Sequence, residues 1–116
     1  MNFREALGRH LLAIEERNLE ALAATVADPL ILIMADGKLK RSKAEFVEAH
    51  RGCFAMKNWT LTAKPVEIYE ADALGVAVLH LDYREDAKKS ESYLTLVFER
   101  RGGGWLMVQD QNTPIR

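Results

Sequence analysis

The sequence has little of what stabilises secreted proteins or places proteins in membranes. Its 1 cysteine, Cys53, has no partner for an intrachain disulfide, and no spacing of cysteine and histidine resembles a zinc site. It also lacks a long apolar run near the start: charged side chains interrupt the segment MNFREALGRHLL, which predicts neither a signal peptide nor a transmembrane span. A reducing compartment fits these absences, and we expect a cytoplasmic protein.

An excess of charge of either sign is absent too. The chain has 16 Lys and Arg against 17 Asp and Glu, a formal net charge of -1. Binding to nucleic acid or to an anionic membrane needs a clustered basic excess, so we expect neither partner. What is present is an ordinary globular composition, 48% hydrophobic and 28% charged. A length of 116 residues predicts a single domain spanning 1–116.

Three helices are predicted in the first half of the chain. Over residues 3–14 apolar side chains recur at spacings of three and four, which is typical of an amphipathic helix. Asn18, a preferred N-cap residue, precedes a segment rich in Ala and Leu, which predicts a shorter helix that ends near Asp28, before Pro29. The motif SKAE, which begins at Ser42, is a capping box and predicts the start of the third helix.

The remaining segments are typical of strands. LILIMADG is a short apolar run closed by an Asp-Gly turn signal, which predicts a buried strand. Four later segments are rich in β-branched and aromatic residues and are separated by turn clusters: NWTLTAKPVEIYE, LGVAVLHLDYRE, ESYLTLVFERR and WLMVQDQNTP. Helices followed by strands predict an α+β fold, with the helices packed on one face of a curved, mixed or antiparallel sheet.

Alternate residues of a strand lie on opposite faces of the sheet, and in the predicted strands both faces start with apolar residues. In LGVAVLHLDYRE, one face carries Val76, Val78 and His80 and the other carries Ala77, Leu79 and Leu81. A sheet covered by helices on one side alone should show a polar outer face. We therefore expect a second copy of the chain to cover the outer face in a two-fold dimer.

The last strand runs from apolar to polar on each face. Strict alternation places Trp105, Met107, Gln109 and Gln111 on one face, and Leu106, Val108, Asp110 and Asn112 on the other. A strand end exposed to solvent would explain the polar half without any function.

The order of elements, with the segments DALGVAVLHLDY and FERRGGGWLMVQDQNT, resembles the nuclear transport factor 2-like superfamily. This superfamily includes ketosteroid isomerases, SnoaL-type polyketide cyclases and the association domain of calcium/calmodulin-dependent kinases. The resemblance implies a cone: a bent sheet that wraps three N-terminal helices and leaves a pocket between its concave face and the first and third helices. It also implies a homodimer through the convex face, to which alternation assigns Trp105, Met107, Gln109 and Gln111.

The same resemblance places His80, Leu96 and Asn112 at pocket-facing positions. With Asp110, we expect His80 and Asn112 to form a catalytic group: an imidazole or carboxylate as general base and an amide that polarises a carbonyl. The alternative is structural, with His80 as a core histidine and Asp110 bonded to backbone amides. His50, His80 and Asp110 would resemble a metal site of two histidines and one carboxylate, but their spacing in the sequence does not support one. We therefore expect no metal and no cofactor.

An apolar wall for a ligand is predicted from His50, Phe54, Trp59 and Leu96. His10 is expected on the surface of the first helix, and Tyr83 falls on the face opposite to His80. The sequence therefore favours a protein that binds a small, mostly apolar carbonyl or hydroxyl compound, as an isomerase, cyclase or dehydratase does. A non-catalytic homodimerisation or regulatory ligand-binding module is the alternative.

Overall fold

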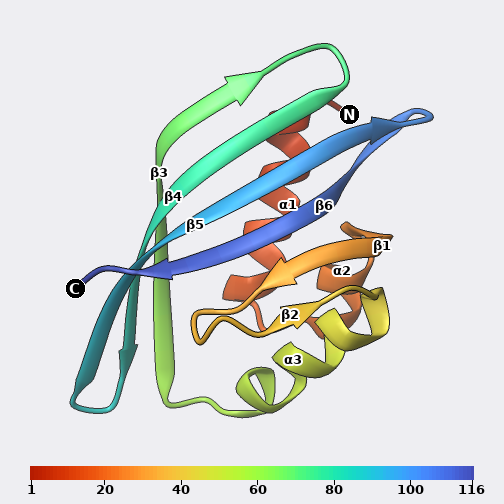
Figure 1. Ribbon diagram of the computed structural model, residues 1–116. Coiled ribbons are helices and arrows are strands. Elements are labelled where there is room, and N and C mark those ends of the chain that lie inside the picture. Colours follow the sequence, from red (N-terminus) through yellow and green to blue (C-terminus); the bar gives the residue numbers. More distant parts are fainter.

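The computed structural model describes residues 1–116 and contains three helices and one curved six-stranded sheet (Figure 1). The helices are α1 (Phe3–Glu15), α2 (Leu19–Ala23) and α3 (Lys43–Ala55). The strands are β1 (Val26–Ile33), β2 (Leu39–Lys40), β3 (Trp59–Glu70), β4 (Leu74–Glu85), β5 (Lys88–Arg101) and β6 (Gly104–Pro114). None of the helices combines the length and the apolar character needed to cross a membrane.

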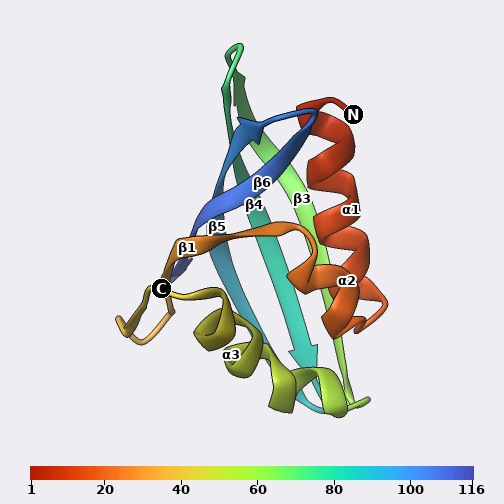
Figure 2. The same cartoon turned by 90° about the vertical axis from the view of Figure 1, so that its right-hand side faces the viewer.

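The sheet is mixed and does not close into a barrel. Its strand order is β2-β1-β6-β5-β4-β3, in which β1 runs parallel to β6 and every other neighbour is antiparallel. Figure 2 shows the sheet from the side, with the helices gathered along one face. This arrangement confirms the predicted α+β cone. The concave face is the one toward the helices, and the convex face is the opposite one.

The predicted helix starts are confirmed, but one helix end is not. Capping boxes start α1 at Asn2 and α3 at Ser42, and the Asn18 side chain accepts a hydrogen bond from a backbone amide in the first turn of α2. The prediction that α2 extends to Asp28 was wrong, because the helix ends at Ala23. Val26 instead enters the sheet, where it is 2% exposed and pairs with β6.

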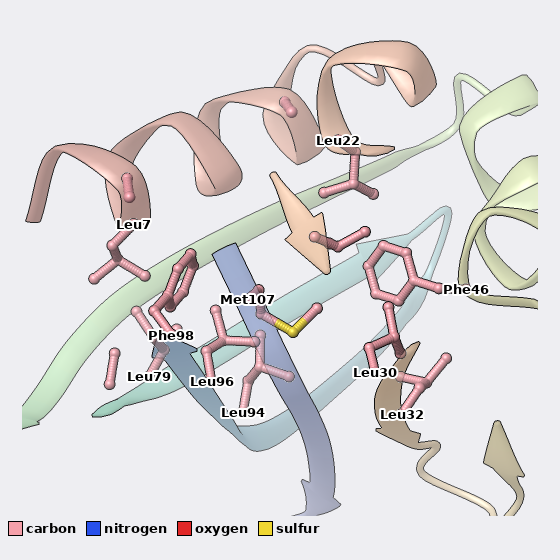
Figure 3. Close-up of a cluster of buried hydrophobic side chains, with 14 of the residues drawn as sticks. Leu7, Leu22, Leu30, Leu32, Phe46, Leu79, Leu94, Leu96, Phe98 and Met107 are labelled. Atoms are coloured by element: carbon pink, nitrogen blue, oxygen red, sulfur yellow. The ribbon is translucent and has the colours of Figure 1, made fainter. Parts of the chain in front are cut away.

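The core lies between α1, α3 and the concave face (Figure 3). Phe3 packs edge-on against Phe98 with ring centroids 5.6 Å apart, and Phe46 of α3 is fully buried at the other end. Phe3 also lies directly over the strand at Gly75, where a Cβ would stand 2.5 Å from its ring, so only glycine fits there. The remaining core is mainly aliphatic: Leu7, Leu22, Leu30, Leu32, Ala77, Leu79, Leu94, Leu96 and Met107.

The prediction that His80 lies on the concave face was wrong. Its strand buries the alternate residues, and Leu79 and Leu81 are 0% and 6% exposed toward the helices. His80 lies on the convex face beside its cross-strand neighbours Lys64 and Tyr93. Alternation separated the two sets correctly, but since both are apolar it did not show which set packs under the helices.

A bulge in β6 overturns part of the predicted face of the last strand. Phe98 pairs with Met107 while Val97 pairs with Gln109, so the residue between them on β6 has no partner and the alternation shifts by one. Met107 is therefore buried in the core at 0% exposure, and Trp105 packs on the ring of Phe3 at 5.7 Å. Their predicted place on the convex face was wrong.

Beyond the bulge the predicted faces hold. Gln109 and Gln111 pair with Val97 and Thr95 on the convex face. Asp110 is buried on the concave face, opposite Leu96. The bulge therefore places apolar and polar parts of β6 on the same, helix-facing side.

Candidate functional site

A cavity of about 490 Å³ lies between α3, the end of α1 and the concave face of the sheet. Of its 20 lining residues 13 are hydrophobic. Its volume falls in the range of roughly 300–1,000 Å³ that is usual for sites of small molecules. The polar side chains among the lining are few, and each has a defined position.

Asp110 is the buried acid of this cavity. It lies in the middle of β6, between Leu96 on β5 and Leu32 on β1, and is 6% exposed. Its carboxyl group makes no hydrogen bond within the protein, yet no polar side-chain atom sealed from solvent lacks a partner, so its oxygens open into the cavity. Burial raises the pKa of Asp110 to about 7, because the low-dielectric surroundings disfavour the charged form.

Asn112 lines the same cavity two residues further along β6, on the same face as Asp110. The side-chain amide can donate and accept hydrogen bonds without carrying a charge. The two side chains thus form a short polar strip in a largely apolar cavity.

His50 enters the cavity from α3. Its Nδ1 lies 2.8 Å from the carbonyl oxygen of Phe46, one helical turn earlier. A carbonyl only accepts, so Nδ1 carries the hydrogen and Nε2 is left with a free lone pair. Burial lowers the pKa of His50, and the hydrogen bond to Phe46 opposes this in part, so the ring is held neutral.

Three rings, from Phe54, Trp59 and Tyr83, form one side of the cavity, which we term the aromatic wall. The ring of Trp59 stacks on that of Tyr83, with centroids 5.9 Å apart and an interplanar angle of 24°, and lies 6.4 Å from Phe54. Trp59 Nε1 donates to the carbonyl oxygen of Cys53 at 2.7 Å, which ties the start of β3 to the end of α3. The wall is thus built from α3, β3 and β4.

Arg17 holds the aromatic wall from outside the cavity. It follows α1 with φ of 54°, the left-handed conformation typical of a helix C-terminus. Its Cζ lies 3.9 Å from the centroid of the Trp59 ring, Nε donates to the Met56 carbonyl at 3.2 Å, and Nη2 donates to the Trp59 carbonyl. We call these contacts the Arg17 clamp, since they join α1 to the loop between α3 and β3.

Tyr83 is a cavity residue that the sequence interpretation placed on the wrong face. Its hydroxyl donates to Glu85 Oε1 at 2.7 Å. Burial, and secondarily the hydrogen bond to Glu85, raise the pKa of Tyr83 to about 12. The signal that could have found it is the size of its neighbours: Leu79 and Leu81, two and four residues earlier, are bulkier than the valines of the other face.

Five of the seven predicted site residues line the cavity: His50, Phe54, Trp59, Asp110 and Asn112. Leu96 does not, because it is fully buried in the core. His80 does not either: on the convex face its Nε2 lies 3.3 Å from Glu91 Oε1. The structure therefore brings Asp110 and Asn112 together but does not join His80 to them. Cys53 and Ser92 line the cavity as well and had no recognisable signal in the sequence.

A second cavity, of about 500 Å³, lies outside α1 and α2, near the start of β6. Its charged residues are carried on the surface, among them Arg9 and Glu16. The hydroxyl of Thr25, which also lines it, is already bonded to His10 and to the Leu22 carbonyl. Of these two cavities, only the first contains a largely buried acid whose oxygens make no hydrogen bond within the protein, so it is the candidate functional site.

The curved sheet, the helices on its concave side and the cavity between them define a cone of the nuclear transport factor 2-like class. Residues 4–114 match the family model of the SnoaL-like domain. The chain therefore belongs to the SnoaL-like family.

Solved structures of low sequence identity share the fold. A candidate calcium/calmodulin-dependent protein kinase type II association domain from Thiobacillus denitrificans is 20% identical with a TM-score of 0.87, covering 99% of this chain and 96% of that chain. A candidate ketosteroid isomerase from Shewanella frigidimarina is 18% identical with a TM-score of 0.83, covering 94% and 92%. A nuclear transport factor 2-like protein from Cytophaga hutchinsonii is 18% identical with a TM-score of 0.78, covering 99% and 100%. No curated protein matches the chain.

Proposed function

We propose that the chain binds a small, mostly apolar carbonyl or hydroxyl compound in the cavity and moves a proton on it, as an isomerase, cyclase or dehydratase does. The observation that carries this proposal is the carboxyl group of Asp110, which is buried, has no partner in the protein and opens into a cavity of about 490 Å³. A largely buried acid that makes no hydrogen bond within its own protein needs an explanation, and a perturbed acid in a cleft is a candidate for a functional site.

The polar side chains suit an acid that is still partly protonated at neutral pH and a base whose uncharged form is favoured. Asp110, with its pKa raised to about 7, can give its proton to a carbonyl oxygen. His50 can accept a proton at Nε2 from the carbon next to that carbonyl, and the electron pair of the broken C–H bond becomes the C=C bond of the enol. The Asn112 amide would donate to the same oxygen as charge develops on it. In a β,γ-unsaturated ketone, His50 would return its proton to the γ carbon of the dienol while the oxygen gives its proton back to Asp110, which completes an isomerisation.

The test is exchange of substrate hydrogens with solvent deuterium, followed by NMR, for a panel of planar cyclic ketones. Removal of a positioned acid or base typically slows such a step by roughly 10²–10⁴-fold, so we expect Asp110→Asn and His50→Gln each to show that loss. The matched control is Asp82→Asn, which removes a carboxylate on the convex face and should leave exchange unchanged. Equal exchange with and without the protein, for every ketone that binds, would contradict proton transfer.

A second candidate function, homodimerisation, is favoured by the convex face. Val76, Val78 and Val97 lie on it, and it includes the exposed ring of Tyr93, 45% accessible. The fold likeness to a kinase association domain also supports the proposal. Gln109 and Gln111 would extend this interface, whereas Trp105 and Met107 would not, because they pack on the other side.

Solution mass at micromolar concentration tests the dimer. We expect a dimer for the unchanged chain and a monomer for Val97→Lys, because the substitution would bury an unpaired charge in the interface. Leu12→Lys adds the same charge at an exposed position of α1, on the opposite side of the sheet, and should leave the dimer intact. A monomeric unchanged chain would refute this candidate function without bearing on the cavity.

A further inference from the structure

The cavity that surrounds Asp110 contains no cationic side chain. Its lining includes neither Lys nor Arg. Glu91, the other acid of the lining, is on the convex parity of β5 and pairs with His80 there. The guanidinium of Arg17 is occupied by the Trp59 ring and two backbone carbonyls. Asp110 thus faces the cavity without a counter-charge, which a buried carboxylate ordinarily requires.

We propose that this cavity also accepts a protonated amine carried on an apolar ring system, which pairs with Asp110 as a carboxylate and competes with neutral ligands. The inference rests on the proposed function only in requiring that the same cavity be open to ligands. It adds a second class of ligand, defined by charge.

The chemistry of the lining matches an ammonium group at one end and a ring at the other. An ammonium has three donors, and the side-chain oxygens of Asp110 and Asn112 lie on the same face of β6 to accept them. The aromatic wall provides ring faces and edges for the apolar part of the ligand. A carboxylate ligand would meet the opposite situation, since it would lose its hydration beside another acid and find no cation.

Binding of the amine should depend on pH through Asp110 alone. The other titratable residues of the lining are His50 and Cys53 on α3, Tyr83 on β4 and Glu91 on β5, whose carboxylate contacts His80 on the convex face. Burial lowers the pKa of His50 and raises those of Cys53 and Tyr83, which favours the uncharged form of all three groups. Asp110, with a pKa of about 7, loses its proton between about pH 6 and 8. Affinity for the amine should therefore rise with pH across that interval.

Three probes of similar shape separate the effect of ligand charge on affinity from the effect of steric fit: 2-naphthylmethylamine, 2-naphthylmethanol and 2-naphthoate. Titration calorimetry on the intact chain at pH 8 should give the amine an affinity about tenfold higher than that of the alcohol, the difference between a charge-assisted and a neutral hydrogen bond. The carboxylate should bind weakest. At pH 6 the advantage of the amine should shrink to about threefold or less, because the proton on Asp110 must first be displaced. The amine should also displace the alcohol.

Two variants assign the effect to one carboxyl group. Asp110→Asn keeps the shape and removes the charge, so the amine should lose its advantage while the affinity for the alcohol changes by less than about threefold. Asp110→Ala provides a second test should the amide disturb the strand. Asp82→Asn removes a carboxylate from the convex face and should preserve the preference for the amine.

The outcomes distinguish this inference from the proposed function. Tight binding of the alcohol with no preference for the amine at pH 8 would overturn the inference and leave the proposed function standing. Binding of none of the three probes at millimolar concentration would overturn both. A preference for the amine that survives in Asp110→Asn would show that another residue recognises the ammonium charge, and it would also overturn the inference.

Discussion

His10 and Asp110 are both buried polar residues, but only His10 has a hydrogen-bond partner within the protein. His10 is 1% exposed, and its Nδ1 lies 2.8 Å from Thr25 Oγ1. The hydroxyl of Thr25 donates to the Leu22 carbonyl at 2.6 Å, so the imidazole is the donor in the first contact. Asp110, 6% exposed, has no such partner and faces a cavity.

The difference separates a structural polar group from a functional one. The ring of His10 packs against the core ring of Phe98 at 5.7 Å, and its satisfied donor fixes the end of α2 against α1. Burial lowers the pKa of His10 to about 3, with a smaller repulsion from His50, and raises that of Asp110 to about 7. Burial therefore favours the uncharged form of both groups, but only Asp110 has open space beside it in which a ligand can complete its hydrogen bonds.

Substitution by alanine should have the largest effect of the predicted changes, and it should change the stability of the protein in opposite directions at His10 and Asp110. His10→Ala removes a packed ring and leaves Thr25 with one partner fewer, which should cost about 2–4 kcal/mol of unfolding free energy. Asp110→Ala removes an unsatisfied carboxyl group beside an existing cavity and should be neutral or stabilising by a few kcal/mol at pH 8. Urea denaturation measures both. Equal destabilisation by the two substitutions would mean that Asp110 is a structural residue.

The pH dependence of the same two variants should sharpen the contrast. The pKa of His10 is lowered from 6.5 to about 3, so between these values the unfolded chain binds a proton that the folded chain refuses, and stability falls as pH falls. The pKa of Asp110 is raised from 3.8 to about 7, so between these values the folded chain keeps a proton that the unfolded chain loses, and stability falls as pH rises.

These two dependences oppose each other and should nearly cancel in the unchanged chain between about pH 4 and 6.5. Each variant removes one of them. The cost of His10→Ala should shrink as pH falls from 7 to 4, and the gain from Asp110→Ala should shrink over the same interval, each by on the order of 1 kcal/mol per pH unit. Denaturation curves at four pH values would show it, and parallel profiles for both variants and the parent would contradict the assignment of either shift.

The sequence predicted the fold because its signals are local and consistent. The capping box at Ser42 and the Asp-Gly turn at Asp36 act over a few residues, and both occur as expected. The end of α2 was missed because burial of Val26 against β6 outweighs the helix propensity of its neighbours, and that strand is distant in sequence.

The site was predicted only where alternation is unbroken or where a residue lies on a helix. His50 and Phe54 on α3, and Asp110 beyond the bulge, reach the cavity as expected. Met107 and His80 did not lie where expected, for different reasons: a bulge shifts the alternation of one strand, and two apolar faces conceal the orientation of the other. His10 was expected on the surface because no local signal reveals that Thr25 would satisfy it in the core.

The smallest predicted effect concerns the Arg17 clamp. It orders the loop and strand beside the cavity but makes no contact with the residues around His10. Arg17→Gly suits the left-handed backbone at φ of 54° and removes only the side chain, so global stability should fall by about 1 kcal/mol or less. Hydrogen exchange should instead rise locally, by about tenfold over residues 53–61, because Met56 and Trp59 lose their contacts to Arg17.

The affinity for 2-naphthylmethanol should weaken with the same variant, because Trp59 forms the aromatic wall against which the ring would pack. The control is Arg9→Ala, which removes a cation from α1 without the cost of about 1 kcal/mol that glycine would have inside a helix. Exchange over residues 53–61 should stay unchanged in Arg9→Ala. If hydrogen exchange rose equally along the whole chain in Arg17→Gly, Arg17 would stabilise the fold in general. The region around His10 and the region around the cavity would then not be stabilised independently.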